Sequence, residues 1–277
     1  MKKACVIGWP ITHSRSPLIH GFWLKQYGID GSYDRVPVPP EGLHHFVSSL
    51  AMNGYLGCNV TIPHKEQVFA MVEPGNDLTR RLGVVNTVYR RDDYLMGIST
   101  DGEGFIANLR ASLPSLSLKG KRAVMLGAGG AAMAIAGALI AEGVTELVVA
   151  NRSPQRTEIL RRKFGVVIVP ARWEDRSVVL ESAGLLVNTT SLGMTGQPVL
   201  DISLDRLPRE AVVTDIVYAP LRTPLLENAA ERGHPIVEGL GMLLHQAVPG
   251  FELWFGKRPA VTRELYDLVV ADLQAAK

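Results

Sequence analysis

The feature that most constrains the fold is the segment VMLGAGGAA, residues 124–132. An apolar strand runs directly into a glycine turn there, and a helix of small residues follows. Backbone N–H groups in such a turn can approach a pyrophosphate, and the positive end of the following helix favours the same anion. Three glycines alone are weak evidence, but the strand and helix on either side favour a dinucleotide site. We therefore expect a doubly wound α/β domain around this segment.

The rest of this domain alternates between strand and helix patterns in the same way. The uncharged run 123–141 approaches the length of a membrane-spanning helix. Its strand, glycine turn and helix explain the run as two buried elements, so we expect no membrane span. The predicted strands are 122–126, 146–150, 166–170, 185–188 and 211–217, with helices at 130–142 and 154–163.

The N-terminal part of the chain predicts a second α/β domain. Strands at 4–9, 32–38 and 55–62 alternate with helices, which favours a parallel sheet. The first helix is expected to use Ser16 as its N-cap and Pro17 as its first helical residue. The segments 84–91 and 94–100 predict a hairpin, and helices are expected at 41–52, 103–112, 240–255 and 259–274. Periodicity does not assign the last two helices to either domain.

Length and composition describe a globular protein that acts on a small molecule. The 277 residues allow two domains, with 47% hydrophobic and 20% charged residues. The net charge of +2 gives no indication of nucleic acid or acidic membranes as partners. Cys5 and Cys58 lie in apolar segments as expected for free thiols, and the N-terminus lacks a signal-peptide pattern, so a cytoplasmic protein is expected. The seven histidines show no metal-ligand spacing, so no metal is predicted.

The residues after the second strand of the nucleotide domain indicate which cofactor is bound. An NAD site usually has Asp or Glu there to bind the ribose 2′-hydroxyl, and a carboxylate repels the 2′-phosphate of NADP. This chain has Asn151, Arg152 and Ser153, with Arg156 one helical turn further on. A guanidinium binds phosphate through two parallel hydrogen bonds, so NADP is favoured.

Four polar clusters near strand ends of the first domain are candidates for a substrate site. Taken singly, each has an ordinary structural explanation as a cap or a turn residue. Together they supply hydroxyls, amides, one cation and one carboxylate for a small polyhydroxylated acid. The clusters are HSRSP with Ser14 and Ser16, NVTIPHK with Asn59, Thr61 and Lys65, VVNT with Asn86 and Thr87, and STDG with Asp101.

With these clusters in place, the chain resembles the shikimate dehydrogenase family from residue 6 to about 256. The resemblance rests on nine motifs in the family's order and spacing: GWPITHSRSP, NVTIPHK, GVVNT, TDG, GAGGAA, NRS, NTTSLGM, DIVYAPLRTPLL and GLGMLLHQAVPGFELWFG. It implies reversible, NADP-dependent reduction of 3-dehydroshikimate to shikimate, in the biosynthesis of aromatic amino acids. It also implies a catalytic domain and a Rossmann domain flanking a cleft, in a monomer or homodimer. The expected domains are 1–103 plus 240–277 for substrate and 104–239 for NADP, with the C-terminal helices returning to the first domain.

The resemblance also assigns roles residue by residue. Lys65 and Asp101 match the catalytic pair. Ser14 and Ser16 match the hydroxyls that bind the substrate carboxylate, with Tyr218 nearby. The residues that bind the ring hydroxyls or lie beside them match Asn59, Thr61, Asn86, Asp101 and Gln246. The cofactor positions match Gly127, Ala128, Gly129, Gly130, Ala131, Asn151, Arg152, Ser153, Arg156, Thr189, Met194, Val217, Gly239 and Met242.

Two alternatives stay open beside this assignment. A quinate/shikimate dehydrogenase shares the fold and uses NAD more readily, although the serine pair and the basic loop favour the NADP-linked shikimate enzyme. A catalytically silent ligand sensor would keep the pocket, but both Lys65 and Asp101 are present. Departures from the commonest family pattern occur at Arg15, Gly21, Ser99 and Ala219, and none removes a residue with a named chemical role.

Overall fold

The computed structural model describes residues 1–275 and divides the chain into two compact units. The first unit contains Met1–Asp101 and Leu244–Asp272. The second contains Gly102–Leu243 and, of the described residues, 273–275. The three boundaries fall inside helices, namely α5 (Asp101–Ser112), α9 (Leu240–Phe255) and α10 (Arg263–Ala275). The segment Leu244–Asp272, whose domain the periodicity did not assign, therefore belongs to the first unit.

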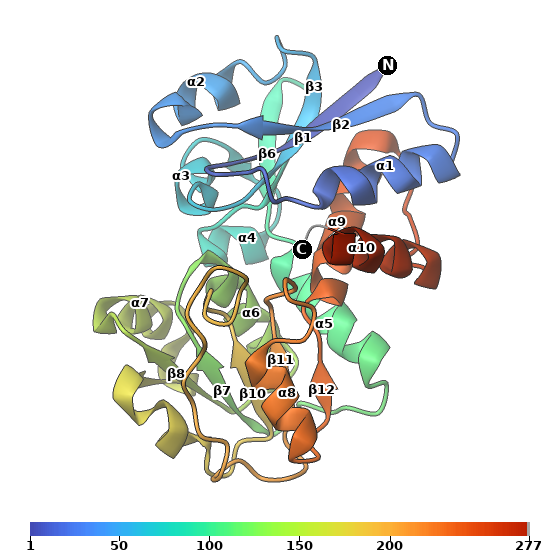
Figure 1. Ribbon diagram of the computed structural model, residues 1–277. Helices are drawn as coiled ribbons and strands as arrows, with labels where there is room; N and C mark the ends of the chain where they lie inside the picture. The colour runs from blue at the N-terminus through green and yellow to red at the C-terminus, as the bar shows by residue number, and fades with distance from the viewer. Residues whose placement is uncertain (276–277) are drawn as a thin grey trace. The chain divides into compact units, whose positions relative to one another are not determined.

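The first unit is built on a six-stranded mixed sheet (Figure 1). The first three strands along the chain are parallel, as expected, and the predicted hairpin is present. The hairpin joins the sheet antiparallel to its central strand, so the sheet is not purely parallel. The strand order is β2 (Gly31–Pro37), β1 (Lys2–Gly8), β3 (Tyr55–Val60), β5 (Thr87–Arg91), β6 (Tyr94–Ile98) and β4 (Glu73–Pro74).

One helix start in this unit differs from the sequence prediction. Arg15, not Ser16, takes the N-cap position of the first helix, and Ser16 is its first helical residue. The backbone N–H of Ser16 is satisfied by the Ser14 hydroxyl at 3.3 Å, which leaves the Ser16 side chain free of a capping role. The helical segments of the unit are α1 (Ser16–Gln26), η1 (Pro40–Gly42), α2 (Leu43–Ser48), α3 (Lys65–Phe69), α4 (Asp77–Leu82) and α10 (Arg263–Ala275).

The two faces of this sheet are covered by different kinds of side chain. On one face, aliphatic residues of the strands pack with residues of α2 and α3, among them Leu43, Val47 and Val68. Rings of α1 and α9, such as Trp23 and Phe251 at 5.3 Å between centroids, form an aromatic cluster with strand residue Tyr33. The indole of Trp254 on α9 donates to the Val88 carbonyl at 2.9 Å. A Cβ at Gly57 would lie 2.1 Å from that carbonyl oxygen, so only glycine permits this approach.

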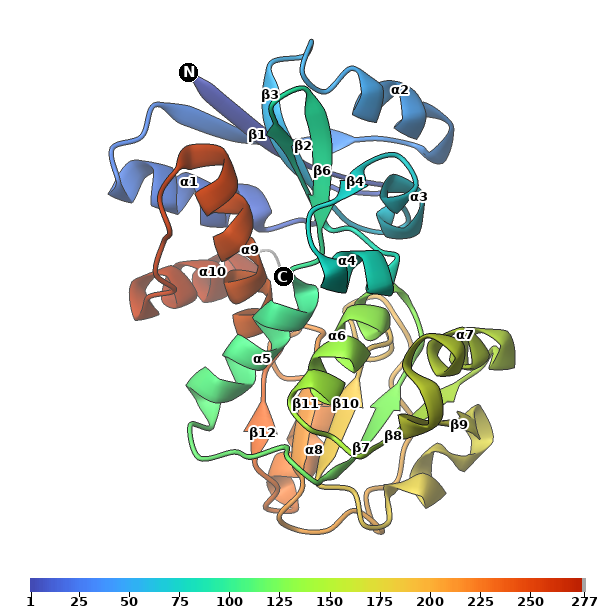
Figure 2. The same ribbon diagram turned by 180° about the vertical axis from the view of Figure 1, so that it is seen from behind.

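The second unit is a six-stranded parallel sheet with the order expected of a doubly wound fold. From the central β7 the chain adds β8 and β9 on one side, then returns to add β10, β11 and β12 on the other. Helices α6 and α7 lie on one face of the sheet and α8 on the other (Figures 1 and 2). The strands are β12 (Ile236–Val237), β11 (Val212–Asp215), β10 (Leu185–Asn188), β7 (Arg122–Leu126), β8 (Glu146–Asn151) and β9 (Ile168–Arg172).

The helices of this unit are α5 from Gly102 onward, α6 (Gly130–Ala141), α7 (Pro154–Phe164) and α8 (Pro224–Glu231), with short segments η2 (Gly165–Val167) and η3 (Trp173–Leu180). The uncharged run 123–141 is divided between β7 and α6, as predicted. Over residues 1–275, no helix combines the length and the apolar character needed to cross a bilayer.

Candidate active site

The polar clusters of the first unit come together at one edge of its sheet. Strands β1 and β3 are parallel and β6 points the same way, because it is antiparallel to β5 and β5 is antiparallel to β3. Ser14 follows β1, Lys65 follows β3 and Asp101 follows β6, whereas Asn86 immediately precedes β5. All four segments therefore meet at the carboxyl-terminal edge of the parallel strands, where open α/β sheets bind ligands.

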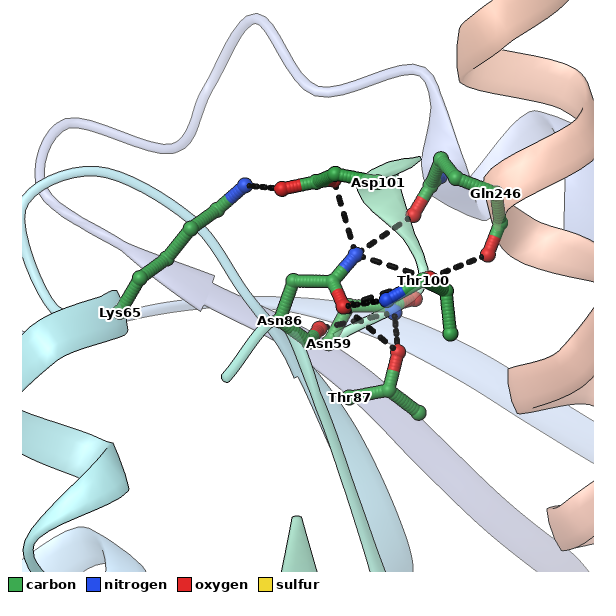
Figure 3. A network of polar contacts seen from close by, with 7 residues as sticks. All are labelled: Asn59, Lys65, Asn86, Thr87, Thr100, Asp101 and Gln246. Atoms are coloured by element: carbon green, nitrogen blue, oxygen red, sulfur yellow. Dashed lines mark hydrogen bonds and ion pairs between the residues drawn. The ribbon is translucent and has the colours of Figure 1, made fainter. Parts of the chain in front are cut away.

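Lys65 and Asp101 form an ion pair at this edge (Figure 3). Lys65 is the first residue of α3, where the helix dipole disfavours a cation, and the Asp101 carboxylate compensates for it. The side chains are 14% and 7% exposed, so the pair is largely shielded from water. His64, which precedes Lys65, is buried and its Nε2 lies 2.7 Å from the Val38 carbonyl oxygen, which fixes the start of the helix.

Asn86 connects this ion pair to helix α9. Its amide Nδ2 donates to Asp101 Oδ1 at 2.9 Å, to Thr100 Oγ1 at 2.9 Å and to Gln246 Oε1 at 3.2 Å. Its Oδ1 accepts from the Thr100 backbone N–H at 2.7 Å, and the Thr100 hydroxyl donates to the Gln246 carbonyl at 2.8 Å. The network orients the Asp101 carboxylate through Oδ1, whereas Lys65 contacts Oδ2 (Figure 3).

Asn59 lies in strand β3, and both its side-chain oxygen and its side-chain nitrogen are hydrogen-bonded within the protein. It is 5% exposed, and its Oδ1 accepts from the Tyr33 hydroxyl at 2.5 Å. Its Nδ2 donates to the Asn86 carbonyl and to Thr87 Oγ1, both at 3.1 Å. Burial raises the pKa of Tyr33 well above its usual value, so the phenol is a neutral donor. Asn59 therefore uses its hydrogen-bonding groups within the protein.

The loop that carries Ser14 and Ser16, called the serine loop below, is connected to the same region. The Ser16 side chain is buried, and its interaction with the Tyr33 hydroxyl partly offsets the rise in the Tyr33 pKa. Arg35 Nε donates to the Ser14 carbonyl at 2.8 Å and Arg15 forms an ion pair with Asp272 on α10 at 2.5 Å. The Arg35 guanidinium thus lies beside the serine loop and favours an anion there, whereas the charge of Arg15 is paired with Asp272.

The structure thus links most of the predicted substrate residues of this unit, with some additions. Asn59, Lys65, Asn86, Asp101 and Gln246 are joined through hydrogen bonds and the ion pair, and Ser16 is hydrogen-bonded to Ser14 through its backbone N–H. Thr61 lies in the loop after β3, where its N–H donates to the Ile7 carbonyl, and Tyr218 belongs to the second unit. Sequence reasoning did not select Tyr33 or Thr100. Thr100 stands inside the STDG motif, whereas Tyr33 in an ordinary strand pattern gave no signal.

In the second unit, the glycine turn between β7 and α6 has the features of a phosphate cradle. Gly127 has φ +100°, and a Cβ there would lie 2.7 Å from Thr189 Oγ1. At Gly129 a Cβ would meet nothing within 4 Å, so the turn is open on that side. Gly129 is also the N-cap of α6 and provides no side-chain cap for the first-turn N–H groups. These residues fit a pyrophosphate, whose oxygens would satisfy those donors.

The loop after β8 fits the 2′-phosphate of NADP. Arg152 is exposed, and Asn151 Nδ2 donates to the Ser153 carbonyl at 2.9 Å, which shapes the turn before α7. No carboxylate occupies residues 151–156. Among the described residues, no cluster of three or more His, Cys, Asp or Glu side chains could hold a metal ion.

The remaining predicted cofactor residues lie at the carboxyl-terminal ends of neighbouring strands or just after them. Thr189 follows β10 and donates from its N–H and its hydroxyl to the Leu126 carbonyl at 2.8 and 2.6 Å. Gly239 packs so closely on the segment after β11 that a Cβ would lie 2.6 Å from three of its backbone atoms. Met194 is 38% exposed, whereas Val217 and Met242 are nearly buried.

A doubly wound sheet with this turn and basic loop, combined with a shielded lysine–carboxylate pair in the other unit, defines a nicotinamide-nucleotide-dependent oxidoreductase. Three family profiles match the chain: "Shikimate dehydrogenase substrate binding domain" over residues 6–88, "Shikimate / quinate 5-dehydrogenase" over 109–206 and "Shikimate 5'-dehydrogenase C-terminal domain" over 239–263. The chain belongs to the shikimate dehydrogenase family.

Individual relatives are similar over nearly their whole length. A shikimate dehydrogenase (NADP(+)) from Nitrobacter winogradskyi is 53% identical over 98% of this chain and 97% of its own length. One from Rhodopseudomonas palustris is 54% identical over 98% and 96%. The shikimate 5-dehydrogenase of Thermus thermophilus, solved with NADP(H) and shikimate, is 34% identical with a TM-score of 0.86 over the whole of both chains. A quinate dehydrogenase from Corynebacterium glutamicum, solved with NAD, is 28% identical with a TM-score of 0.88 over 98% of this chain and 99% of its own.

Proposed function

We propose that this chain catalyses the reversible, NADP-dependent interconversion of 3-dehydroshikimate and shikimate. The observation that carries the proposal is the shielded Lys65–Asp101 pair, oriented by Asn86 at the edge where parallel sheets bind ligands. The names and cofactor of the most similar relatives support the same activity.

On the substrate side, we assign the carboxylate to the Ser14 and Ser16 hydroxyls, and we assign Tyr218 to substrate binding as well. The Arg35 guanidinium supports the serine assignment because it makes the loop attractive to an anion. The ring hydroxyls are assigned to Thr61, Asn86, Asp101 and Gln246, with Asn59 beside them.

Lys65 acts as the acid in the direction of ketone reduction. Bound NADPH supplies a hydride to the ketone carbon. The Lys65 ammonium donates a proton to the ketone oxygen as that oxygen gains negative charge, so the product is the alcohol. Asp101 holds the ammonium in place and accepts a hydrogen bond from a substrate hydroxyl. In the direction of shikimate oxidation, Lys65 takes the hydroxyl proton.

On the cofactor side, we assign the pyrophosphate to residues 127–131 and the 2′-phosphate to residues 151–153 with Arg156. Thr189, Met194, Val217, Gly239 and Met242 are assigned to the path of the adenosine and nicotinamide groups. The corresponding domains are 1–103 with 240–277 for substrate and 104–239 for NADP. We also place the protein in the cytoplasm, a proposal supported by two buried free thiols, Cys5 and Cys58.

A four-way comparison of kcat/KM tests the function. Purified protein is assayed at 340 nm with shikimate or quinate as substrate and NADP or NAD as cofactor. We expect shikimate with NADP to give the highest kcat/KM by at least about tenfold, since a guanidinium–phosphate contact is worth about 1.5–3 kcal/mol. A preference for quinate with NAD would identify a quinate dehydrogenase instead. If none of the four combinations formed reduced cofactor, the protein would be a catalytically silent ligand sensor.

A further inference from the structure

A second buried polar cluster lies in the nucleotide-binding unit, at the carboxyl-terminal ends of β10 and β11. Its centre is Asp215, the last residue of β11, which is 0% exposed. Its register partner on β10 is Asn188, also 0% exposed. Asp215 Oδ1 accepts from Asn188 Nδ2 at 3.0 Å and from the Val217 N–H at 2.9 Å, and Oδ2 accepts from the Thr223 hydroxyl at 2.8 Å. Neither side chain has a part in the chemistry described above.

Each member of the pair fixes one loop. Asn188 Oδ1 accepts from the N–H and the hydroxyl of Thr190 at 3.1 and 2.8 Å, and its Nδ2 donates to the Leu192 carbonyl at 3.2 Å. Asp215 anchors the following loop at Val217 and again at Thr223, which caps α8. The loops 189–195 and 216–223 are also joined directly, by the Thr195 N–H and the Ala219 carbonyl at 2.8 Å.

These two loops carry residues assigned above to the cofactor. Thr189 contacts the glycine turn, because its hydroxyl occupies the space that a Cβ at Gly127 would need. Met194 lies in the first loop and Val217 in the second. A change in the Asn188–Asp215 contact would therefore displace both loops beside the glycine turn.

Burying a carboxyl here is costly, which makes a purely packing role a poor explanation. The three donors to Asp215 are all neutral groups, and burial raises the pKa of Asp215 to about 6 despite them. A carboxyl can accept several hydrogen bonds from different directions at once, which an apolar residue of similar size cannot do. The residue is thus suited to joining several backbone segments in one arrangement.

We propose that Asp215, together with Asn188, is a positioning residue that holds loops 189–195 and 216–223 in the arrangement that binds NADP(H). The inference rests on the proposed function, because it takes NADP(H) as the ligand of these loops. It predicts an effect on cofactor affinity, which is measured without shikimate because Tyr218 in loop 216–223 is assigned to the substrate.

The test is the dissociation constant of NADPH for the purified full-length protein, followed by fluorescence titration without substrate. Asp215→Ala is expected to weaken NADPH binding about tenfold, the effect of one to two net hydrogen bonds. Asp215→Asn retains an oxygen for Val217 and Asn188 and an amide for the Thr223 oxygen, so it should restore affinity to within about threefold. Asp201→Ala is the matched control, because the Asp201 side chain is 96% exposed in the same unit.

A double-mutant cycle with Asn188→Ala separates positioning from general loosening. If the two side chains act as one unit, the double variant should bind NADPH about as weakly as Asp215→Ala alone. Fully additive losses would overturn the proposal, and so would wild-type affinity in Asp215→Ala or a loss that Asp215→Asn does not restore. If Asp215→Ala does not fold, Thr190→Val removes the Thr190 hydroxyl contacts alone, and unchanged affinity in that variant would refute the inference.

The outcomes that would refute the proposed function differ from those that would refute the positioning role. If the wild-type protein does not bind NADPH or forms none from shikimate, the function is wrong. If the wild type does both and the Asp215 variants bind NADPH normally, only the positioning role is wrong.

Discussion

Asp101→Asn is the substitution whose effect the structure predicts in most detail. The amide keeps an oxygen that can accept from Asn86 Nδ2, now 2.9 Å from Asp101 Oδ1, and removes the charge that holds Lys65. A hydrogen bond to a charged group is worth about 1.5–3 kcal/mol, and the pair is shielded enough from water for that value to apply. At about 1.4 kcal/mol per factor of ten in rate, kcat should fall about 10- to 100-fold.

Steady-state formation of NADPH from shikimate at 340 nm measures this loss, and a thermal melt checks that the variant is folded. Asp175→Asn is the control, because it makes the same chemical change in an exposed ion pair with Arg172. It should leave kcat unchanged. If folded Asp101→Asn kept more than about a third of the wild-type kcat, the ion pair would not be what positions Lys65.

Single sites elsewhere in the chain give three further predictions. Gly127→Ala should weaken NADPH binding at least tenfold, since φ is +100° and the added Cβ would meet Thr189 Oγ1 at 2.7 Å. Unchanged NADPH affinity in a titration would contradict the proposal that this glycine turn binds the pyrophosphate. Arg152→Ala should raise KM for NADP about tenfold and leave KM for NAD unchanged. Equal effects on both KM values would show that Arg152 does not bind the 2′-phosphate. Burial lowers the pKa of His20 to about 3, so between about pH 6.5 and 3 the unfolded chain binds a proton that the folded protein does not. The free energy of unfolding should therefore decrease as pH falls through this window, and urea titrations should show a shallower decrease in His20→Phe, by up to about 1.4 kcal/mol per pH unit. An identical slope in both proteins would show that His20 is protonated in the folded state.

Local patterns predicted the nucleotide-binding unit well because each of its signals acts within a few residues. The strand–turn–helix at Gly127 and the basic loop at Arg152 depend on neighbouring residues alone, and β7 has the predicted bounds, 122–126. Short elements gave less signal. The helix α8 and the two-residue strand β12 were not predicted, because an eight-residue helix and a two-residue strand show too little periodicity.

The polar network of the first unit depends on contacts that no local pattern contains. Asn59 could be selected from its motif, but its engagement by Tyr33, 26 residues away, depends on the pairing of β1 with both β2 and β3. The same holds for Asn86 and Gln246, which are 160 residues apart. The N-cap of α1 was predicted at Ser16 and lies at Arg15, because the Ser14 hydroxyl accepts the Ser16 N–H and shifts the helix start by one residue.

We propose that Lys65 transfers the proton in the reaction with shikimate, and the turnover of Lys65→Ala is the measurement that tests this role. The variant is assayed with saturating NADP over a range of shikimate concentrations, with Lys25→Ala on the exposed face of α1 as the control. We predict that kcat falls by about 10²-fold or more, the usual contribution of a general acid–base group, while KM for shikimate stays similar. A variant that kept most of its turnover would contradict the account.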